Sequence, residues 1–137
     1  MLKLALATVC FVLALNTAAS AQTRVQLSGV PAGAVRIPAK QIFDLYNGRT
    51  YAFESYAERQ PIVGFVRFDL RNGRNVGRWR QGKKTGNFSG RVRFIKDLIC
   101  YKLQGENNET CNAVFVTRSE IFEVNDRRRV DTVLFRE

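Results

Sequence analysis

The side chains in this chain that are best suited to bind a charged partner are arginines, and they are concentrated in one stretch. Residues 67–96 carry ten Lys and Arg side chains but a single acid, Asp69, which gives a net charge of +9. A guanidinium group presents a planar pair of N–H donors that matches phosphate and carboxylate oxygens. Alternation along the expected strands turns five of these arginines outward, and we expect them to bind anions: Arg67, Arg78, Arg80, Arg91 and Arg93.

The charges elsewhere in the chain nearly balance. Residues 22–66 have a net charge of +2 and residues 97–137 a net charge of −2. The run Arg127–Arg129 is flanked by Asp126 and Asp131, so we expect it to be a solvated turn. The alternative for the arginine-rich stretch is a basic face that only keeps the protein soluble.

The residue types of this chain do not favour an enzyme. The chain contains no histidine, which removes Ser–His and Cys–His catalysis and histidine-ligated metals. Paired carboxylates, as in glycosidases, remain as an alternative, but no spacing selects a pair. The candidate acids are Asp44, Asp69, Asp97, Glu120, Glu123 and Asp131. No phosphate-loop or dinucleotide motif is present, so we expect a protein that is not an enzyme and has neither cofactor nor metal.

The chain has three cysteines, and two of them, Cys100 and Cys111, remain once the expected leader is removed. An even number of cysteines in an exported chain is typical of disulfides, so we expect these two to form one. The third, Cys10, falls in the leader. A metal or redox pair is the alternative, and the long spacing and the lack of histidine disfavour it. A loop of this length corresponds to roughly 3 kcal/mol of stabilisation in the chain-entropy model.

Residues 1–21 have the form of an export signal. Lys3 supplies the positive charge, and Leu4–Leu15 is apolar but shorter than the roughly 20 residues that a membrane span needs. Ala19-Ser20-Ala21 matches a cleavage site, so we expect a single domain over residues 22–137 that is periplasmic or secreted. A buried N-terminal helix is the alternative.

The elements that position the charged side chains are mostly strands. Residues 22–37 look extended, and apolar spacing after Pro38 predicts one short helix that ends at Asn47-Gly48. From residue 50 the apolar residues alternate, which is typical of strands. Eight are expected: Thr50–Glu54, Pro61–Phe68, a partner strand that contains Trp79, Asn87–Ile95, Leu98–Leu103, Thr110–Thr117, Ser119–Asn125 and Arg129–Arg136. Without βαβ alternation, this order predicts an all-β fold, a small antiparallel eight-stranded meander barrel with one short N-terminal helix.

Two turns should set the register. A two-residue turn at Asn72-Gly73 would pair Val66 with Trp79 and Arg67 with Arg78, a like-charge pair. A second tip at Gly105-Glu106 would place the two cysteines opposite each other, and a longer tip through Asn107-Asn108 would also keep them close.

The aromatic residues point to a packed interior. Six of them are expected in the core: Phe53, Phe65, Trp79, Phe88, Phe94 and Phe115. An eight-stranded barrel can hold one small ligand or be filled by its own side chains, and ten phenylalanines favour a filled interior.

Three segments carry a resemblance to known proteins: PAKQIFDLYNGRTYAF, FVRFDLRNGRNVGRWR and LICYKLQGENNETCNAVF. Their order resembles a group of small exported alphaproteobacterial proteins of unknown function with lipocalin-like or avidin-like barrels. Gly77 and Trp79 occupy the Gly-x-Trp strand of that group, whereas Asn72-Gly73 departs from its turn because it lies three residues after Asp69. The resemblance implies a lipocalin-like barrel and export, and it implies no activity.

These features lead us to expect binding rather than catalysis. We expect an exported monomer whose arginines bind an anionic envelope component: a lipid headgroup at a membrane surface, lipopolysaccharide, a cell-wall polymer or an acidic protein. The compartment argues against nucleic acid. One alternative is a lipocalin-like carrier of a small apolar ligand, and another is a structural or stress-related envelope protein.

Overall fold

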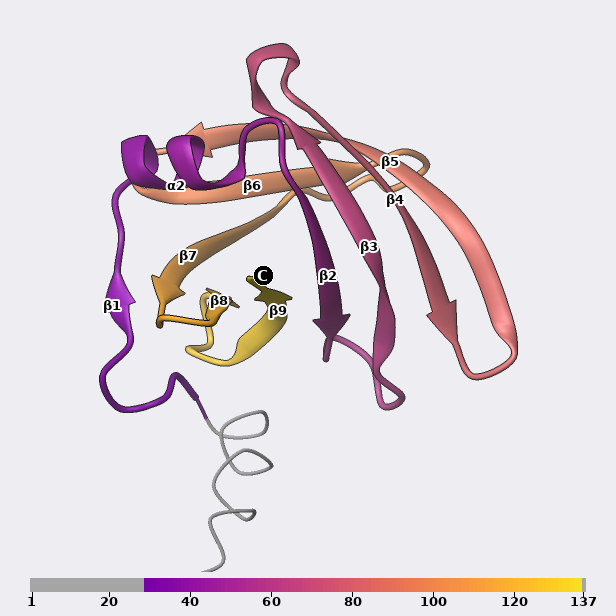
Figure 1. Ribbon diagram of the computed structural model, residues 1–137. Coiled ribbons are helices and arrows are strands. Elements are labelled where there is room, and N and C mark those ends of the chain that lie inside the picture. Colours follow the sequence, from indigo (N-terminus) through magenta and orange to yellow (C-terminus); the bar gives the residue numbers. More distant parts are fainter. Residues whose placement is uncertain (1–28, 137) are drawn as a thin grey trace, which may run out of the picture.

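The computed structural model describes residues 29–136 (Figure 1). The expected export signal at residues 1–21, the cleavage before Gln22 and Cys10 lie outside the described residues. The described part contains one helix, α2 (Ala39–Tyr46), a short 3₁₀ turn, η1 (Leu70–Asn72), and nine strands. The strands are β1 (Val35–Arg36), β2 (Thr50–Ser55), β3 (Ile62–Asp69), β4 (Arg74–Gln81), β5 (Lys84–Ile95), β6 (Leu98–Leu103), β7 (Thr110–Val116), β8 (Glu120–Val124) and β9 (Val130–Phe135).

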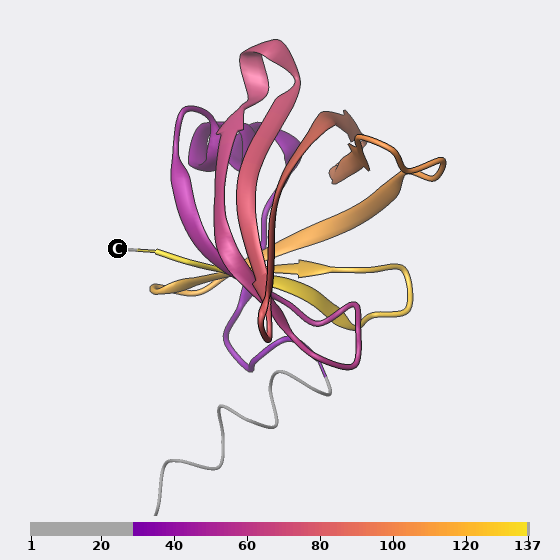
Figure 2. The same cartoon turned by 90° about the vertical axis from the view of Figure 1, so that its right-hand side faces the viewer.

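Strands β2 to β9 form a closed antiparallel barrel in which each strand pairs with the next along the chain. The barrel closes where residues 52–55 of β2 pair with residues 132–135 of β9. Figures 1 and 2 show the sheet curling round to bring these two strands together. The expected all-β fold, an eight-stranded antiparallel meander barrel with one short helix, is therefore confirmed.

Helix α2 covers one end of the barrel. Its apolar spacing buries Ile42 and Tyr46 completely, and the Tyr46 ring packs 4.7 Å from that of Phe68. Just after the helix, the Asn47 side-chain oxygen accepts a hydrogen bond of 3.0 Å from the backbone N–H of Leu70, which fixes the helix end to the β3–β4 turn. The β2–β3 and β4–β5 turns lie at the opposite end of the barrel (Figures 1 and 2). Among residues 29–136, no helix has the length and apolar character that a membrane crossing needs.

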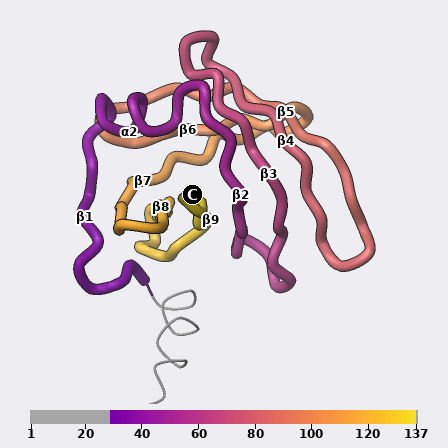
Figure 3. Tube along the Cα trace, in the orientation of Figure 1, coloured from indigo at the N-terminus to yellow at the C-terminus, as the bar shows by residue number. Residues whose placement is uncertain are grey.

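A second, smaller core lies outside the barrel wall. Four side chains of β8 and β9 are buried there: Phe122, Val124, Val130 and Val133. They are covered by Val30, Tyr56 and Phe115. The segment that leads to the helix also runs along this side, where β1 pairs with the end of β7 (Figure 3). The residues before the helix therefore pack on the barrel from outside.

The register between β3 and β4 differs from the sequence-based expectation. The predicted pairs Arg67–Arg78 and Val66–Trp79 are wrong, because Arg67 lies opposite Val76 and Val66 lies opposite Gly77. The register is shifted by two residues, so the side chains expected to face outward still do so.

The side chain of Asp69 explains this shift. Its carboxylate accepts hydrogen bonds from the backbone N–H of Asn72 at 3.4 Å and from the Asn72 side-chain amide at 2.7 Å. These bonds fold the chain into η1 before Gly73 adopts a left-handed φ of 63°. The connection therefore takes four residues, 70–73, instead of two.

Interior glycines make room for aromatic rings. Gly77 of β4 lies opposite Phe88 of β5, and Gly86 of β5 lies opposite Trp79 of β4. A methyl group at Gly86 would lie 2.7 Å from the Trp79 indole, so the ring occupies the space that a side chain would take. This alternation of small and large residues is typical of the inside of small barrels.

Cys100 and Cys111 lie directly opposite each other on β6 and β7 and form a disulfide, which confirms the predicted bond. The hairpin tip is the longer of the two alternatives. Because β6 ends at Leu103 and β7 begins at Thr110, Gly105-Glu106 does not connect the strands as a two-residue turn.

Candidate functional site

The five arginines predicted to bind anions are all exposed on the outer surface of the barrel: Arg67, Arg78, Arg80, Arg91 and Arg93. The structure gathers only three of them. Arg67 lies diagonally across from Arg78, and Arg80 follows Arg78 on the same face of β4. We call Arg67, Arg78 and Arg80 the outer arginine group.

Exposed apolar side chains lie among the outer arginine group. Phe65 is 61% exposed and lies directly opposite Arg78, while Val76 is 49% exposed and lies opposite Arg67. This corrects the expectation that Phe65 is a core residue, because the odd positions of β3 face outward. A hollow of about 860 Å³ lies on this surface, and its lining includes Phe65, Arg78 and Arg80. Such a surface offers apolar contacts and guanidinium donors side by side.

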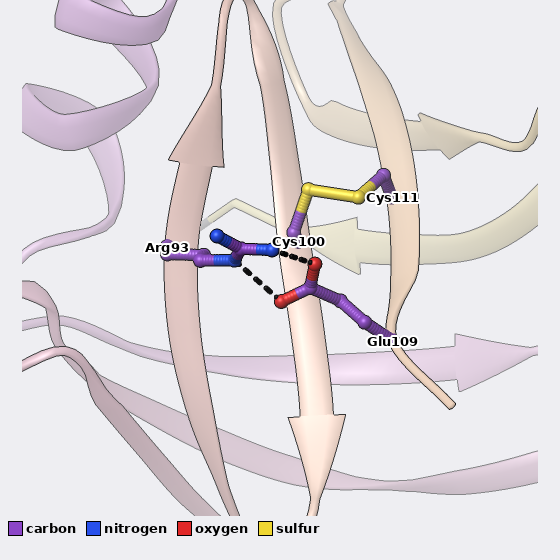
Figure 4. A network of polar contacts seen from close by, with 4 residues as sticks. All are labelled: Arg93, Cys100, Glu109 and Cys111. Carbon is purple, nitrogen blue, oxygen red and sulfur yellow. Dashed lines mark hydrogen bonds and ion pairs between the residues drawn. A yellow bond between two sulfur atoms is a disulfide. The ribbon is translucent and has the colours of Figure 1, made fainter. Parts of the chain in front are cut away.

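Arg93 is already engaged within the protein. Its guanidinium donates two hydrogen bonds to the Glu109 carboxylate, at 2.7 Å from Nε and 2.6 Å from Nη2, beside the disulfide (Figure 4). This pairing raises the pKa of Arg93 and lowers that of Glu109. Glu109 also lies close to both cysteine sulfurs, but sulfurs bonded to each other are not thiolate ligands for a metal.

Arg91 belongs to a different group of cations. It lies opposite Arg74 on one side and Lys102 on the other, and Asp69 opposite Arg74 is the acid at the end of this row. Arg74 and Lys102 were not selected from the sequence. The two-residue turn between Gln81 and Lys84 sets the register of β4 against β5. Recognising this turn in the sequence would have predicted the Arg74–Arg91 pair.

A second candidate site is a cavity of about 460 Å³ inside the barrel. It reaches the β2–β3 and β6–β7 loops at the end opposite α2, so the interior, which the sequence favours as filled, is filled only in part by side chains. Five aromatic side chains, which we call the aromatic wall, line it: Phe53, Phe68, Trp79, Phe88 and Tyr101. Its lining contains no lysine or arginine but does contain four acids: Glu58, Glu106, Glu123 and Asp131.

Glu123 lies deep in this cavity and is only 3% exposed. Its Oε1 accepts hydrogen bonds from the hydroxyl groups of Tyr46 at 2.9 Å and Tyr101 at 2.5 Å. Burial raises the pKa of Glu123 to about 7, although these hydrogen bonds act in the opposite direction. Over residues 29–136 the one ion pair joins Arg93 to Glu109, so no cation of this part of the chain neutralises Glu123.

We call Glu123, Asp131 and Asn112 the acidic cluster. Burial raises the pKa of Asp131, and the Asn112 side chain opposes this effect on both carboxyl groups by hydrogen bonding. The Oδ1 atoms of Asn112 and Asn75 are buried, line the same cavity and have no hydrogen-bond partner within the described residues. The two asparagines are only 1% and 4% exposed, respectively.

Part of the lining of this cavity could be expected from the sequence. Glu123 and Asp131 were among the candidate acids, but strands β8 and β9 bring them together in a way that linear spacing does not reveal. Asn75 and Asn112 were missed. Each is a polar residue at an inward position of an alternating strand, and that position was the available signal.

The fold and these sites define a closed eight-stranded barrel with arginines outside and acids within. Comparisons of the chain with protein-family models, with curated proteins and with solved structures found no match.

Proposed function

We propose that the protein binds an anionic lipid surface through its outer arginine group. The observation that supports this most directly is the exposed Phe65 directly opposite Arg78. Arginines alone would serve solubility, whereas a large exposed aromatic ring among them does not. An anionic bilayer offers phosphate oxygens to the guanidinium groups and an interfacial layer to the ring.

The local charge also supports a membrane partner. Each Lys or Arg near an anionic surface contributes about 1 kcal/mol, so three arginines and one ring would give weak, reversible binding. Glu54 opposes this attraction to some extent, but Val63 lies between it and Arg80 in the register.

Export to the periplasm or beyond the cell is part of this proposal. The Cys100–Cys111 disulfide is typical of oxidising compartments, and the leader pattern agrees with it. In such a compartment a monomeric, non-enzymatic protein would meet envelope lipids and not nucleic acid.

Vesicle flotation tests the proposal. Wild-type protein should float with vesicles of phosphatidylglycerol and phosphatidylcholine but not with phosphatidylcholine alone. Changing Arg67, Arg78 and Arg80 together to Gln should weaken binding by about tenfold or more, since each cation near the surface contributes about 1 kcal/mol. Binding should also fall as salt rises, because exposed charges are screened within about 8 Å at physiological ionic strength.

The matched control changes Arg127, Arg128 and Arg129 to Gln, which removes the same charge from the β8–β9 turn. That variant should keep most of the vesicle binding. Equal weakening by both triple variants would mean that bulk charge governs binding and would contradict a site at the outer arginine group. Phe65→Ser should weaken the binding that remains at high salt.

The internal cavity favours a second candidate function, carriage of a small ligand inside the barrel. Its volume of about 460 Å³ falls in the usual range for ligand sites, about 300–1,000 Å³. The aromatic wall suits a small apolar ligand, which is one of the alternatives that the sequence leaves open. The acids that line the same cavity do not suit a wholly apolar one.

A further inference from the structure

The charge inside the barrel is opposite to the charge of the whole protein. The chain has 22 Lys and Arg residues against 12 Asp and Glu residues. The cavity lining nevertheless contains four acids and no Lys or Arg. Two of the acids, Glu58 and Glu106, lie on exposed loops at the cavity mouth, and the other two lie in the acidic cluster. An anion would meet like charge along this whole path, whereas a cation would be attracted.

Glu123 is a buried carboxyl group that has no cationic partner within the described residues. A buried carboxylate without a counter-charge is unfavourable, and the usual response is a raised pKa. The pKa of Glu123, raised by burial to about 7, fits this condition. A cation bound beside it would supply the missing charge.

The unpaired asparagine oxygens give an independent indication of what the ligand must carry. Buried acceptors without partners are uncommon in folded proteins, and here two of them, in Asn75 and Asn112, line one cavity. A ligand that satisfies them must carry hydrogen-bond donors. A primary ammonium group has three N–H donors, no acceptor and a positive charge.

The walls indicate the rest of the ligand. Aromatic faces attract cations within about 6 Å of the ring centre and also cover apolar groups. The aromatic wall continues into aliphatic side chains of the same lining, among them Ile62, Val66 and Leu134. A ligand with a charged head and an apolar body matches both parts of the cavity.

We propose that the barrel cavity binds a small primary amine in its ammonium form, with the head against the acidic cluster and the apolar body against the aromatic wall. This inference narrows the second candidate function, carriage of a small ligand, and is independent of the outer arginine group.

Three probes of one shape test the proposal with the unaltered protein. They are 2-phenylethylamine, which is a cation at about pH 8, the neutral 2-phenylethanol and the anion phenylacetate. Isothermal titration calorimetry in roughly 0.5 M NaCl suppresses association with the outer surface. We expect the amine to bind about tenfold more tightly than the alcohol, or better, and phenylacetate not to bind.

Two variants locate the binding. Glu123→Gln should reduce amine affinity about tenfold or more while leaving alcohol affinity unchanged, because it removes the charge and keeps the shape. Glu120→Gln, the same change on the outward face of the same strand, should leave amine affinity unaltered. If Glu123→Gln does not fold, as judged by circular dichroism, Asp131→Asn takes its place with the same expectation.

The outcomes separate the ligand class from the carrier function. Equal affinity for the amine and the alcohol would overturn the ammonium proposal and leave an apolar carrier. Binding of none of the three probes would overturn the ammonium proposal and the carrier function together. Equal loss of amine binding in the Glu123 and Glu120 variants would overturn the assignment to the acidic cluster.

Discussion

At the residue scale, the carboxyl group of Glu123 should make the stability of the protein depend on pH. Its pKa of about 7 in the folded state lies above its ordinary value of 4.5. Between these values the folded protein keeps a proton that the unfolded chain has released. The free energy of unfolding should therefore fall as pH rises from about 4.5 to about 7, by about 3 kcal/mol in all.

Denaturant unfolding of wild-type and Glu123→Gln protein across this range checks the prediction. The variant should lose most of the slope, because an amide does not titrate. The groups that face Glu123 are Tyr46 from α2, Tyr101 from β6 and Asp131 from β9. Burial raises the pKa of both tyrosines, so they stay protonated, and the raised pKa of Asp131 should leave a smaller slope in the variant. An unchanged slope in Glu123→Gln would contradict the assignment to Glu123.

The sequence predicts the direction of a side chain better than it predicts the residue that this side chain contacts. Alternation alone placed Arg67, Arg78 and Arg93 outside, and all three are exposed. It did not predict that Arg93 pairs with Glu109, since that contact depends on the path of a six-residue tip between β6 and β7. Orientation follows from the local period of two, whereas pairing follows from loops that the period does not describe.

At the scale of elements, adding even one methyl group at Gly77 should destabilise the fold. A Cβ there would collide with the backbone oxygen of Phe65 and with the ring of Phe88. Gly86 differs, because the atoms nearest to a Cβ there belong to the Trp79 side chain and not to the backbone. Gly77→Ala should therefore destabilise the protein by roughly 1–3 kcal/mol or more, and Gly86→Ala by less.

Thermal or denaturant unfolding of the two alanine variants measures this order. Equal stability of both variants and the wild type would show that the β3–β4–β5 wall gives way more easily than its geometry indicates.

The β3–β4 turn could be predicted from the sequence in its position but not in its length. The strands on both sides follow from alternation, and Asn72-Gly73 correctly marks a turn. The turn length depends on the Asp69 carboxylate, which competes for the Asn72 N–H groups and makes a four-residue connection. Because the shift is an even number of residues, the error in register left the faces of the strands correct.

At the scale of the whole molecule, the fold sorts charge by position. The positive excess of residues 67–96 is exposed, on outward strand faces and in turns, while Glu123 and Asp131 line the interior. The meander barrel followed from the number and order of strands. The cavity did not, since the space left inside depends on strand tilt and stagger as well as on side-chain volume.

The proposed export has a direct test at this scale. Protein isolated from the envelope should have the intact mass of a chain that starts at Gln22, and peptide mapping without reductant should link Cys100 to Cys111. A retained Met1 or a lipid on Cys10 would contradict the predicted leader, and free thiols at both mapped positions would contradict oxidation in that compartment.

The closure of the barrel has a consequence for folding. Neighbouring strands can pair as local hairpins, but β2 and β9 come from the two ends of the barrel-forming segment and must meet last. Until they do, a partly folded chain exposes two unpaired strand edges, which can join a second chain. Refolding should therefore yield more monomer when the protein is dilute. The four residue pairs that complete the cavity wall also keep one chain from exchanging strands with another.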